Sequence, residues 1–418
     1  QKILKISIES GLVVVGQGVS VLGALFILRI LTNNISVEEF GVFALYLTAS
    51  TFINQIFFGA INSSVGRYYA ISIEVGKQFN YIDTIKLLLR KITIGIVLLL
   101  IFVFLALLYL KYNNILEAAA YTLIFALLTG YSSTIISVFN AVRKRKYVAF
   151  VAISDLMVKT ICLNAYFYSV NFQMESMLQV YCVSALISLL INIACLKFLE
   201  KSVFKKIQNV TRNNGSEMWS YAWPFFIMGS IAWLQASSSR WVLEAYSGAV
   251  DVGQFHILSQ ISAPIQVITA VIITYLSPIF FLRMGDGSDV VKNKDIRKIT
   301  LTLSVAGIFV IGSIAWFASK YSNEVAGIIF AKTFEVDMYY LPWFIASAGI
   351  LGISQLFCAA LYGEMREREI IISGVISGIL GLLLNAVFGI NFGLAGVVYA
   401  QLIFAVVNFL LLQRLFLK

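Results

Sequence analysis

Two arginines stand at the ends of apolar segments, Arg29 near the start of the chain and Arg240 about half a chain length later. Each is followed by a Gly-x-Phe sequence that opens the next apolar segment, at Gly41 and at Gly253. A guanidinium group binds phosphate or carboxylate oxygens through two parallel hydrogen bonds. The repeated arginine therefore predicts an anion site built by two related halves. The alternative is that both side chains extend to polar lipid headgroups.

Asp155 and Lys159 form a second pair of charges inside an apolar segment. Their i, i+4 spacing places both side chains on one face of a helix. Ionisable groups in apolar surroundings are costly, and they are candidates for function for that reason. Three interpretations remain open: a structural ion pair, a relay for protons or cations, and a ligand for a substrate phosphate.

Two further ionisable residues follow Arg240. Glu244 lies four residues after it and can pair with it on one helical face, which would weaken Arg240 as an anion ligand. His256 is the only histidine, and its imidazole either titrates near neutral pH or packs as a neutral core group. Asp155, Glu244 and His256 are thus the candidates for coupling to an ion.

Uncharged polar side chains gather in the same regions. Tyr46, Ser50 and Asn54 repeat at every fourth position, Gln235 precedes Arg240 by five residues, and Gln260 follows His256 by one helical turn. Rows of this kind either form hydrogen bonds between helices or line a hydrated cavity between the two halves. Asn54, Gln235 and Gln260 are the candidates for contacts with polar substrate groups.

The elements that must position these residues are membrane helices. Of the 418 residues 60% are hydrophobic and 12% charged, whereas soluble domains carry roughly a quarter of charged residues. At about 20 apolar residues per crossing, the chain predicts twelve transmembrane helices and no soluble domain. The spans lie near 8–31, 40–62, 86–110, 116–140, 147–170, 176–198, 219–243, 253–282, 299–319, 340–362, 370–388 and 394–415. We expect an all-α integral membrane protein with two pseudo-symmetric six-helix lobes, 1–198 and 219–418, joined by a cytoplasmic linker, 199–218.

The distribution of lysine and arginine predicts the orientation. Most of them fall at the N-terminus, in alternate loops and at the C-terminus, which places both termini in the cytoplasm. The net charge of +10 then reflects attraction to anionic lipids rather than to nucleic acid. The basic residues on this side are Lys2, Lys5, Arg67, Lys77, Lys86, Arg90, Lys91, Arg143 to Lys146, Lys197, Lys201, Lys205, Lys206, Arg212, Arg283, Lys292, Lys294, Arg297, Lys298, Arg366, Arg368, Arg414 and Lys418.

The remaining residues give no sign of a metal, a cofactor or an enzyme. The four cysteines lie inside predicted spans without C-x-x-C spacing, and the single histidine argues against paired-histidine metal sites and catalytic triads. The first apolar run lacks a small-residue cleavage site, so we expect a retained helix rather than a signal peptide.

Several segments resemble the polysaccharide-exporter branch of the multidrug/oligosaccharidyl-lipid/polysaccharide (MOP) superfamily, and they are spread over nearly the whole chain. The resemblance includes Arg67, which follows a helix rich in small residues. The matching segments are RILTNNISVEEFGVFAL at 29–45, SRWVLEAYSGAVDVGQFHIL at 239–258, LFCAALYGEMREREI at 356–370 and LLLNAVFGINFGLAGVVYAQ at 382–401.

This resemblance implies a MATE-like fold and a Wzx-type flippase. Such proteins move an oligosaccharide on undecaprenyl pyrophosphate across the bacterial cytoplasmic membrane, for O-antigen or a related surface glycan. The family's cavity arginines match Arg29, Arg67 and Arg240. One departure is Ser239, where the family often has an acidic residue, so the role of that acid does not transfer to this chain.

Two other functions remain open. A drug or organic-cation antiporter of the same superfamily would need buried carboxylates, and only Asp155 lies deep in a span, with Glu244 at the edge of another. A membrane glycosyltransferase or glycan polymerase would normally carry a large outer loop, and none is apparent. Because the chain has no nucleotide-binding P-loop, we expect transport to be driven by a gradient of H+ or Na+ or by downstream consumption of the glycan. The expected partners are the glycan polymerase machinery and membrane lipids.

Overall fold

The computed structural model describes nearly the whole chain, and every element in the described part is a helix. The described residues are 2–74, 78–109, 113–169, 174–199, 212–284, 290–330, 336–364 and 366–417. The helices are α1 (Lys2–Asn34), α2 (Val37–Ile53), the π-helix η1 (Asn54–Phe58), α3 (Gly59–Glu74), α4 (Gln78–Tyr109), α5 (Asn113–Ala141), α6 (Arg145–Ser169), α7 (Met174–Leu199), α8 (Arg212–Tyr246), α9 (Ala249–Met284), α10 (Val290–Lys320), α11 (Ser322–Ile329), the 3-10 helix η2 (Met338–Tyr340), α12 (Leu341–Gly363) and α13 (Glu367–Leu417).

Ten stretches of the described residues are long and apolar enough to cross a membrane. The longest, Arg368–Leu417, has 50 residues and as one α-helix would be about 75 Å long, more than twice the hydrocarbon thickness. Gly393, at φ 56° and ψ −135°, breaks α13 into two helices, as the last two predicted spans require. Helix α8 is not among the ten stretches, but it is continuous and contains the predicted span 219–243. The chain is therefore a multi-pass membrane protein with the predicted all-helical fold.

The chain groups into two compact units. Unit 1 consists of Gln1–Ser20 and Phe43–Trp233, and unit 2 of Val21–Val42 and Leu234–Lys418. The division falls within α1, α2 and α8, so these helices contribute to both units. Of the linker predicted at 199–218, residues 200–211 lie outside the described part, and the rest is helical. The predicted lobe boundaries stay a prediction.

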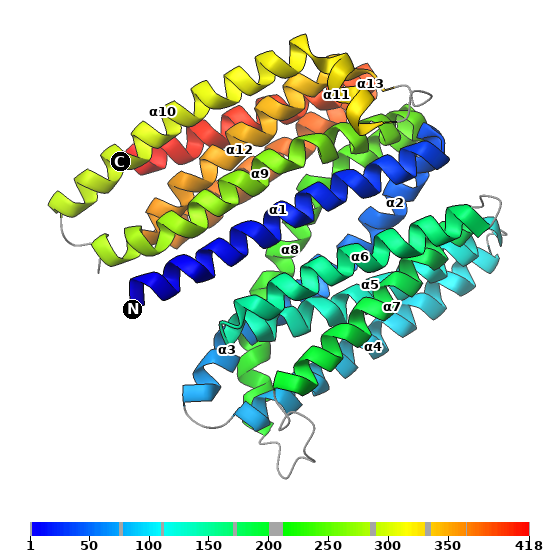
Figure 1. Ribbon diagram of the computed structural model, residues 1–418, viewed down its shortest axis with the longest axis horizontal. Coiled ribbons are helices and arrows are strands. Elements are labelled where there is room, and N and C mark those ends of the chain that lie inside the picture. The colour runs from blue at the N-terminus through cyan, green and yellow to red at the C-terminus, as the bar shows by residue number, and fades with distance from the viewer. Residues whose placement is uncertain are drawn as a thin grey trace. The chain divides into compact units, whose positions relative to one another are not determined.

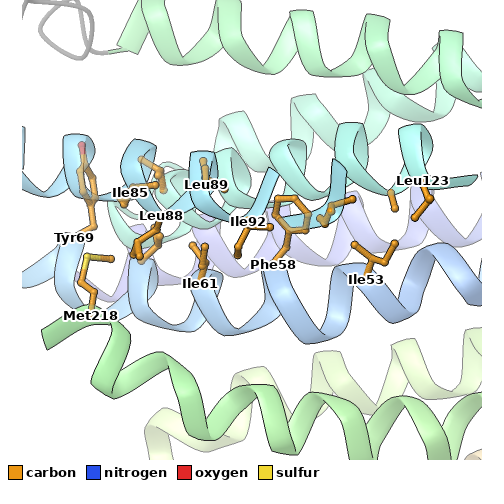
Figure 2. Packing of buried hydrophobic residues seen from close by; sticks show 14 residues of the cluster. Ile53, Phe58, Ile61, Tyr69, Ile85, Leu88, Leu89, Ile92, Leu123 and Met218 are labelled. Atoms are coloured by element: carbon orange, nitrogen blue, oxygen red, sulfur yellow. The ribbon is translucent and has the colours of Figure 1, made fainter. Parts of the chain in front are cut away.

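Unit 1 is a bundle in which α5 packs against α3, α4 and α7, and α7 packs against α6 (Figure 1). Its core is a strip of aliphatic and aromatic side chains from α2, η1, α3, α4, α5 and α8, including fully buried Phe58 of η1 and Tyr69 of α3 (Figure 2). Gly130 of α5 makes room for the Phe58 ring, because a Cβ atom on Gly130 would lie 2.3 Å from it. Since lipid is as apolar as the core, such close contacts, rather than exclusion of water, hold the helices together.

Unit 2 is built on α12, which packs against α9, α10 and α13; Figure 1 shows these four helices side by side. Phe280, Phe357 and Phe416 from three of them are fully buried in one cluster. The outer faces of both units are apolar as well: Phe102 of α4 and Phe309 of α10 are 70% and 73% exposed. In a membrane protein such faces contact lipid.

The two Gly-x-Phe sequences explain a close crossing of α2 and α9 within unit 2. A Cβ atom on Gly41 would lie 1.9 Å from the Ala249 carbonyl oxygen, and one on Gly253 would lie 2.2 Å from the Val37 carbonyl oxygen. The contact is reciprocal: each glycine lies against the first residue of the other helix. Only residues without a side chain allow two helix backbones to approach this closely.

We expect Gly253→Ala to lower the Tm of the purified protein, because the added methyl group must push α9 away from Val37. Overpacking of this kind costs about 1–3 kcal/mol. The measurement is thermal unfolding in detergent. Gly312→Ala is the matched control, since a Cβ atom on Gly312 in α10 would meet nothing within 4 Å. Equal Tm values for the two variants would contradict a close crossing.

Candidate functional site

Arg240 lies in α8 as a half-buried cation. Its Nη1 donates to the Ala236 carbonyl at 3.2 Å, and its Nη2 donates to Ser259 Oγ of α9 at 3.4 Å. The guanidinium carbon lies 5.4 Å from the centre of the Phe255 ring. Nε is buried and makes no hydrogen bond within the described part of the chain. A guanidinium held by neutral groups keeps its full charge and spare donors for a ligand.

The pairing of Arg240 with Glu244 that their spacing permits is absent from the ion pairs among described residues. Side chains on a helix point toward its N-terminus, so Arg240 extends back to Ala236, away from Glu244. The order arginine first, acid second is also the less favourable one. Glu244 Oε2 is instead buried without a hydrogen-bond partner among the described residues.

His256 lies on α9 next to the Arg240 group. Its side chain is 7% exposed, and its ring centre lies 5.3 Å from that of Phe40 in α2. Ser259 Oγ donates to the His256 carbonyl at 2.6 Å and also accepts from Arg240. One hydroxyl group therefore connects the turn of α8 that carries Arg240 to the turn of α9 that carries His256. His256 Nδ1 is buried and forms no hydrogen bond to the residues that the structure describes. A nitrogen without a partner in this position is available to a proton or a ligand.

Arg29 has a different environment from its counterpart. It is an exposed residue of α1, and its Nη1 donates a hydrogen bond to the main-chain carbonyl of Ile328 at the C-terminal end of α11. The last carbonyls of a helix are unpaired and carry partial negative charge, so a cation there is stabilising. Arg29 thus joins α1 to α11, and only part of its five donors is used.

Arg67 lies on α3 and is exposed. Its guanidinium carbon is 4.8 Å from the centre of the Tyr221 ring in α8, at cation–π distance. The ring attracts the cation without a carboxylate or carbonyl acceptor, so the contact leaves the N–H donors of Arg67 available for an anion.

Asp155 pairs with Lys159, as the first of the three interpretations expects. Lys159 Nζ lies 2.8 Å from Asp155 Oδ2, and Ser188 Oγ of α7 donates to the other carboxylate oxygen at 2.8 Å. Both oxygens of Asp155 therefore have partners, and the charge of Lys159 is largely neutralised. This arrangement fits a structural ion pair that also fastens α6 to α7.

Asn54 of the polar row and Asn62, two turns later, both bond to α5. Asn54 Nδ2 donates to Thr129 Oγ1 at 3.0 Å, and Asn62 Nδ2 donates to Ser133 Oγ at 3.0 Å. The side-chain oxygens of Asn54 and Asn62 are buried and unpaired within the described residues. Asn54 thus forms a hydrogen bond between helices, as one of the two interpretations expects, whereas Ser50 bonds to the Leu47 carbonyl of its own helix. The two asparagines leave two acceptors over.

Asn54 also begins the π-helical turn η1, which no feature of the sequence indicates. Such turns interrupt α-helices frequently at functional sites. Gly229 of α8 approaches this turn so closely that a Cβ atom would lie 2.7 Å from the Gln55 carbonyl oxygen. The widened turn and the glycine together allow α8 to contact the backbone of η1.

Gln235 and Gln260 are half-buried residues of α8 and α9 in unit 2. Neither side chain forms a hydrogen bond with another described residue, so both amides are available. Sequence reasoning missed Ser259, Tyr221, Ser188 and Thr129, because hydroxyl partners on other helices leave no pattern along the chain. Among the described residues, no group of histidine, cysteine, aspartate or glutamate could hold a metal ion.

We expect Asp155→Asn to lower the Tm, by the equivalent of about 1–3 kcal/mol, because Lys159 loses its partner in a half-buried position. The double variant Asp155→Leu/Lys159→Met should recover most of the loss, since it removes both charges. Thermal unfolding of the purified proteins in detergent measures both effects. A double variant less stable than Asp155→Asn would contradict the structural ion pair.

Comparison with solved structures shows which fold the two units belong to. The chain is similar to the lipid II flippase MurJ in an inward closed conformation, with 14% identity and a TM-score of 0.67 over 98% of this chain and 87% of MurJ. It is similar to an outward-facing multidrug resistance MATE family transporter, with 13% identity and a TM-score of 0.65 over 99% and 95% of the two chains. A MOP superfamily transporter from Pyrococcus furiosus has 13% identity and a TM-score of 0.63 over 99% and 95%.

These likenesses confirm the MATE-like fold implied by the sequence segments at 29–45 and 239–258. None of the curated protein sequences matches the chain. The sequence pattern of one family does, over residues 9–284, which is more than half of the chain. The chain thus belongs to the Polysaccharide biosynthesis protein family, and its fold is like that of the MurJ and MATE transporters.

Proposed function

We propose that this protein is a flippase that moves an oligosaccharide linked to undecaprenyl pyrophosphate from the inner to the outer leaflet of the bacterial cytoplasmic membrane. The observation that carries the proposal is Arg240, a half-buried guanidinium held by a carbonyl, a hydroxyl and an aromatic ring, without an acidic partner among the described residues. Its family and the MurJ-like fold support a lipid-linked glycan as the substrate.

The chemistry of such a substrate requires a cation inside the membrane. The pyrophosphate is anionic and the sugars are polar, whereas the polyprenyl chain can stay in lipid. Arg240 and Arg29 hold the pyrophosphate through paired N–H donors, and Arg67 guides it from the cytoplasmic side. Asn54, Gln235 and Gln260 contact sugar hydroxyls. Lys159 is a weaker phosphate ligand than the arginines, because Asp155 already neutralises it.

The charge of the site decides between this function and transport of organic cations. For the Pyrococcus furiosus transporter of similar fold, a binding pocket of reversed polarity suggests that it has a different function. A cation antiporter would use Glu244, whose Oε2 is buried and unpaired among the described residues. This oxygen makes the antiporter the second candidate. A glycosyltransferase or polymerase has no such supporting observation, and we propose that the protein forms no glycosidic bond.

The proposed energy source is a gradient of H+ or Na+ or consumption of the exported glycan. His256 and Glu244 are the ion-coupling candidates with unpaired buried atoms, whereas both oxygens of Asp155 are occupied. Both termini lie in the cytoplasm in this proposal, anionic lipids contact the basic loops, and a glycan polymerase on the outer side takes up the product.

We expect Arg240→Gln to reduce export of surface glycan by about 10- to 100-fold, which corresponds to the loss of about 1.5–3 kcal/mol from a charge-assisted hydrogen bond. Arg240→Lys should retain part of the activity, because it keeps the charge but not the paired donors. The assay is complementation of a glycan-export defect, with membrane levels of each variant measured. Arg414→Gln, an exposed arginine near the end of α13, is the matched control. Full export by Arg240→Gln would overturn the role of Arg240.

Reconstitution in liposomes separates the candidate functions. The purified protein is expected to translocate an added undecaprenyl-pyrophosphate-linked saccharide without forming a new glycosidic bond. Uptake of a fluorescent organic cation that Glu244→Gln abolishes would instead establish the antiporter. Elongation of the saccharide would establish an enzyme.

A further inference from the structure

A pocket of about 790 Å³ lies in unit 2, and neither Arg240 nor its partners Ser259 and Phe255 are among the described residues that line it. Its walls come from five elements, α9, α10, α11, η2 and α12, together with Val336 and Asp337 before η2. The side chains that give it its chemical character are Gln254, Asn323, Asp337, Tyr339 and Trp343. Its volume is within the range of about 300–1,000 Å³ that is typical of small-molecule sites.

Two aromatic side chains give the pocket flat apolar surfaces. Trp343 and Tyr339 remain 36% and 64% exposed. Each packs against a neighbouring ring: the ring centre of Trp343 lies 5.8 Å from that of Tyr399 of α13 at 72°, and the ring centre of Tyr339 lies 5.3 Å from that of Tyr340 at 80°. The rings are therefore fixed in orientation while much of their surface stays open, which lowers the entropic cost of binding a ligand.

Three planar polar side chains accompany these rings. Asp337 Oδ1 accepts a hydrogen bond from the Tyr339 amide at 3.1 Å, which fixes the carboxylate. Its second oxygen, and the amides of Gln254 and Asn323, form no hydrogen bond with another described residue. Such groups offer both donors and acceptors at the wall of the pocket.

The described part of the lining carries one negative charge and no positive charge, which disfavours an anionic ligand. Among the described lining residues Asp337 is the only carboxylate, and none is a lysine or an arginine. A carboxylate without a cation beside it repels phosphate. Aromatic faces next to amides and one carboxylate fit a ligand with an apolar face and a hydroxyl-bearing edge.

We propose that this pocket binds an uncharged saccharide. The C–H face of the sugar ring lies on Trp343 or Tyr339, and its hydroxyl groups bond to Gln254, Asn323 and Asp337. None of the arginines proposed to hold pyrophosphate is among the described lining residues, and the site would serve a sugar unit whether or not a lipid carrier is attached.

The position of α11 connects the pocket to Arg29. Ser322, Asn323 and Ala326 of α11 line the pocket, and the other end of this short helix accepts the hydrogen bond from Arg29 at Ile328. Since α11 has only eight residues, too few to be stable alone, its anchoring by Arg29 helps to keep the pocket wall in place.

The test uses the full-length protein in lipid nanodiscs and free sugars without a carrier: glucose, galactose, N-acetylglucosamine and rhamnose. Saturation-transfer NMR is expected to detect binding of at least one of them, with a Kd on the order of millimolar. Trp343→Leu and Asn323→Ala should each weaken it by about tenfold or more. Trp316→Leu is the matched control, because Trp316 of α10 is exposed but does not line the pocket. Inorganic pyrophosphate should not compete.

The result that overturns the proposal is absence of binding by all four sugars, or binding that Trp343→Leu and Asn323→Ala leave unchanged. Either would indicate that Trp343 and Tyr339 only anchor the helix ends at the lipid headgroups, where such residues are enriched. Competition by pyrophosphate would likewise contradict a site for uncharged ligands. Because free sugars carry no diphosphate, the binding of sugars to this pocket is tested independently of whether Arg240 supports flipping.

Discussion

The structure depends on one constraint: lipid offers no hydrogen bonds, so a polar group inside the membrane must be satisfied within the protein or be left for a ligand. This constraint sorts the polar residues of the chain. Asp155 is satisfied by Lys159 and Ser188, and the amide nitrogen of Asn54 is satisfied by Thr129. Groups of this kind hold helices together.

Arg240, Glu244 and His256 belong to the second class. Each has a buried nitrogen or oxygen atom without a partner among the described residues, although the three lie on adjoining turns of α8 and α9 in one unit. An unpaired buried polar atom costs about 1–3 kcal/mol, and two of these atoms belong to Arg240 and His256, which Ser259 connects. A site that binds a charged headgroup, or a proton, explains why the cost is tolerated.

Some of this was predictable from sequence because it depends on local spacing. Composition predicts the helices, the interval between Asp155 and Lys159 predicts their ion pair, and the Gly-x-Phe repeat marks Gly41 and Gly253. The same spacing rule was wrong for Arg240 and Glu244, since it ignores the direction in which helical side chains point. The acceptor of Arg29 could not be predicted, because Ile328 is far along the chain and offers a main-chain carbonyl. The π-turn at Asn54 depends on packing against α8 and leaves no local signal.

The saccharide pocket was missed for a related reason, because its walls combine residues that stand far apart in sequence, such as Gln254, Asn323 and Trp343. Its lining and the Arg240 group differ in charge in a way that matches two parts of one amphiphilic molecule. A diphosphate requires cations and would be repelled by Asp337, whereas a neutral sugar gains little from a guanidinium but much from aromatic faces and amides. A protein that handles both parts benefits from keeping the two chemistries apart, since a sugar site rich in arginine would retain the diphosphate and slow its release.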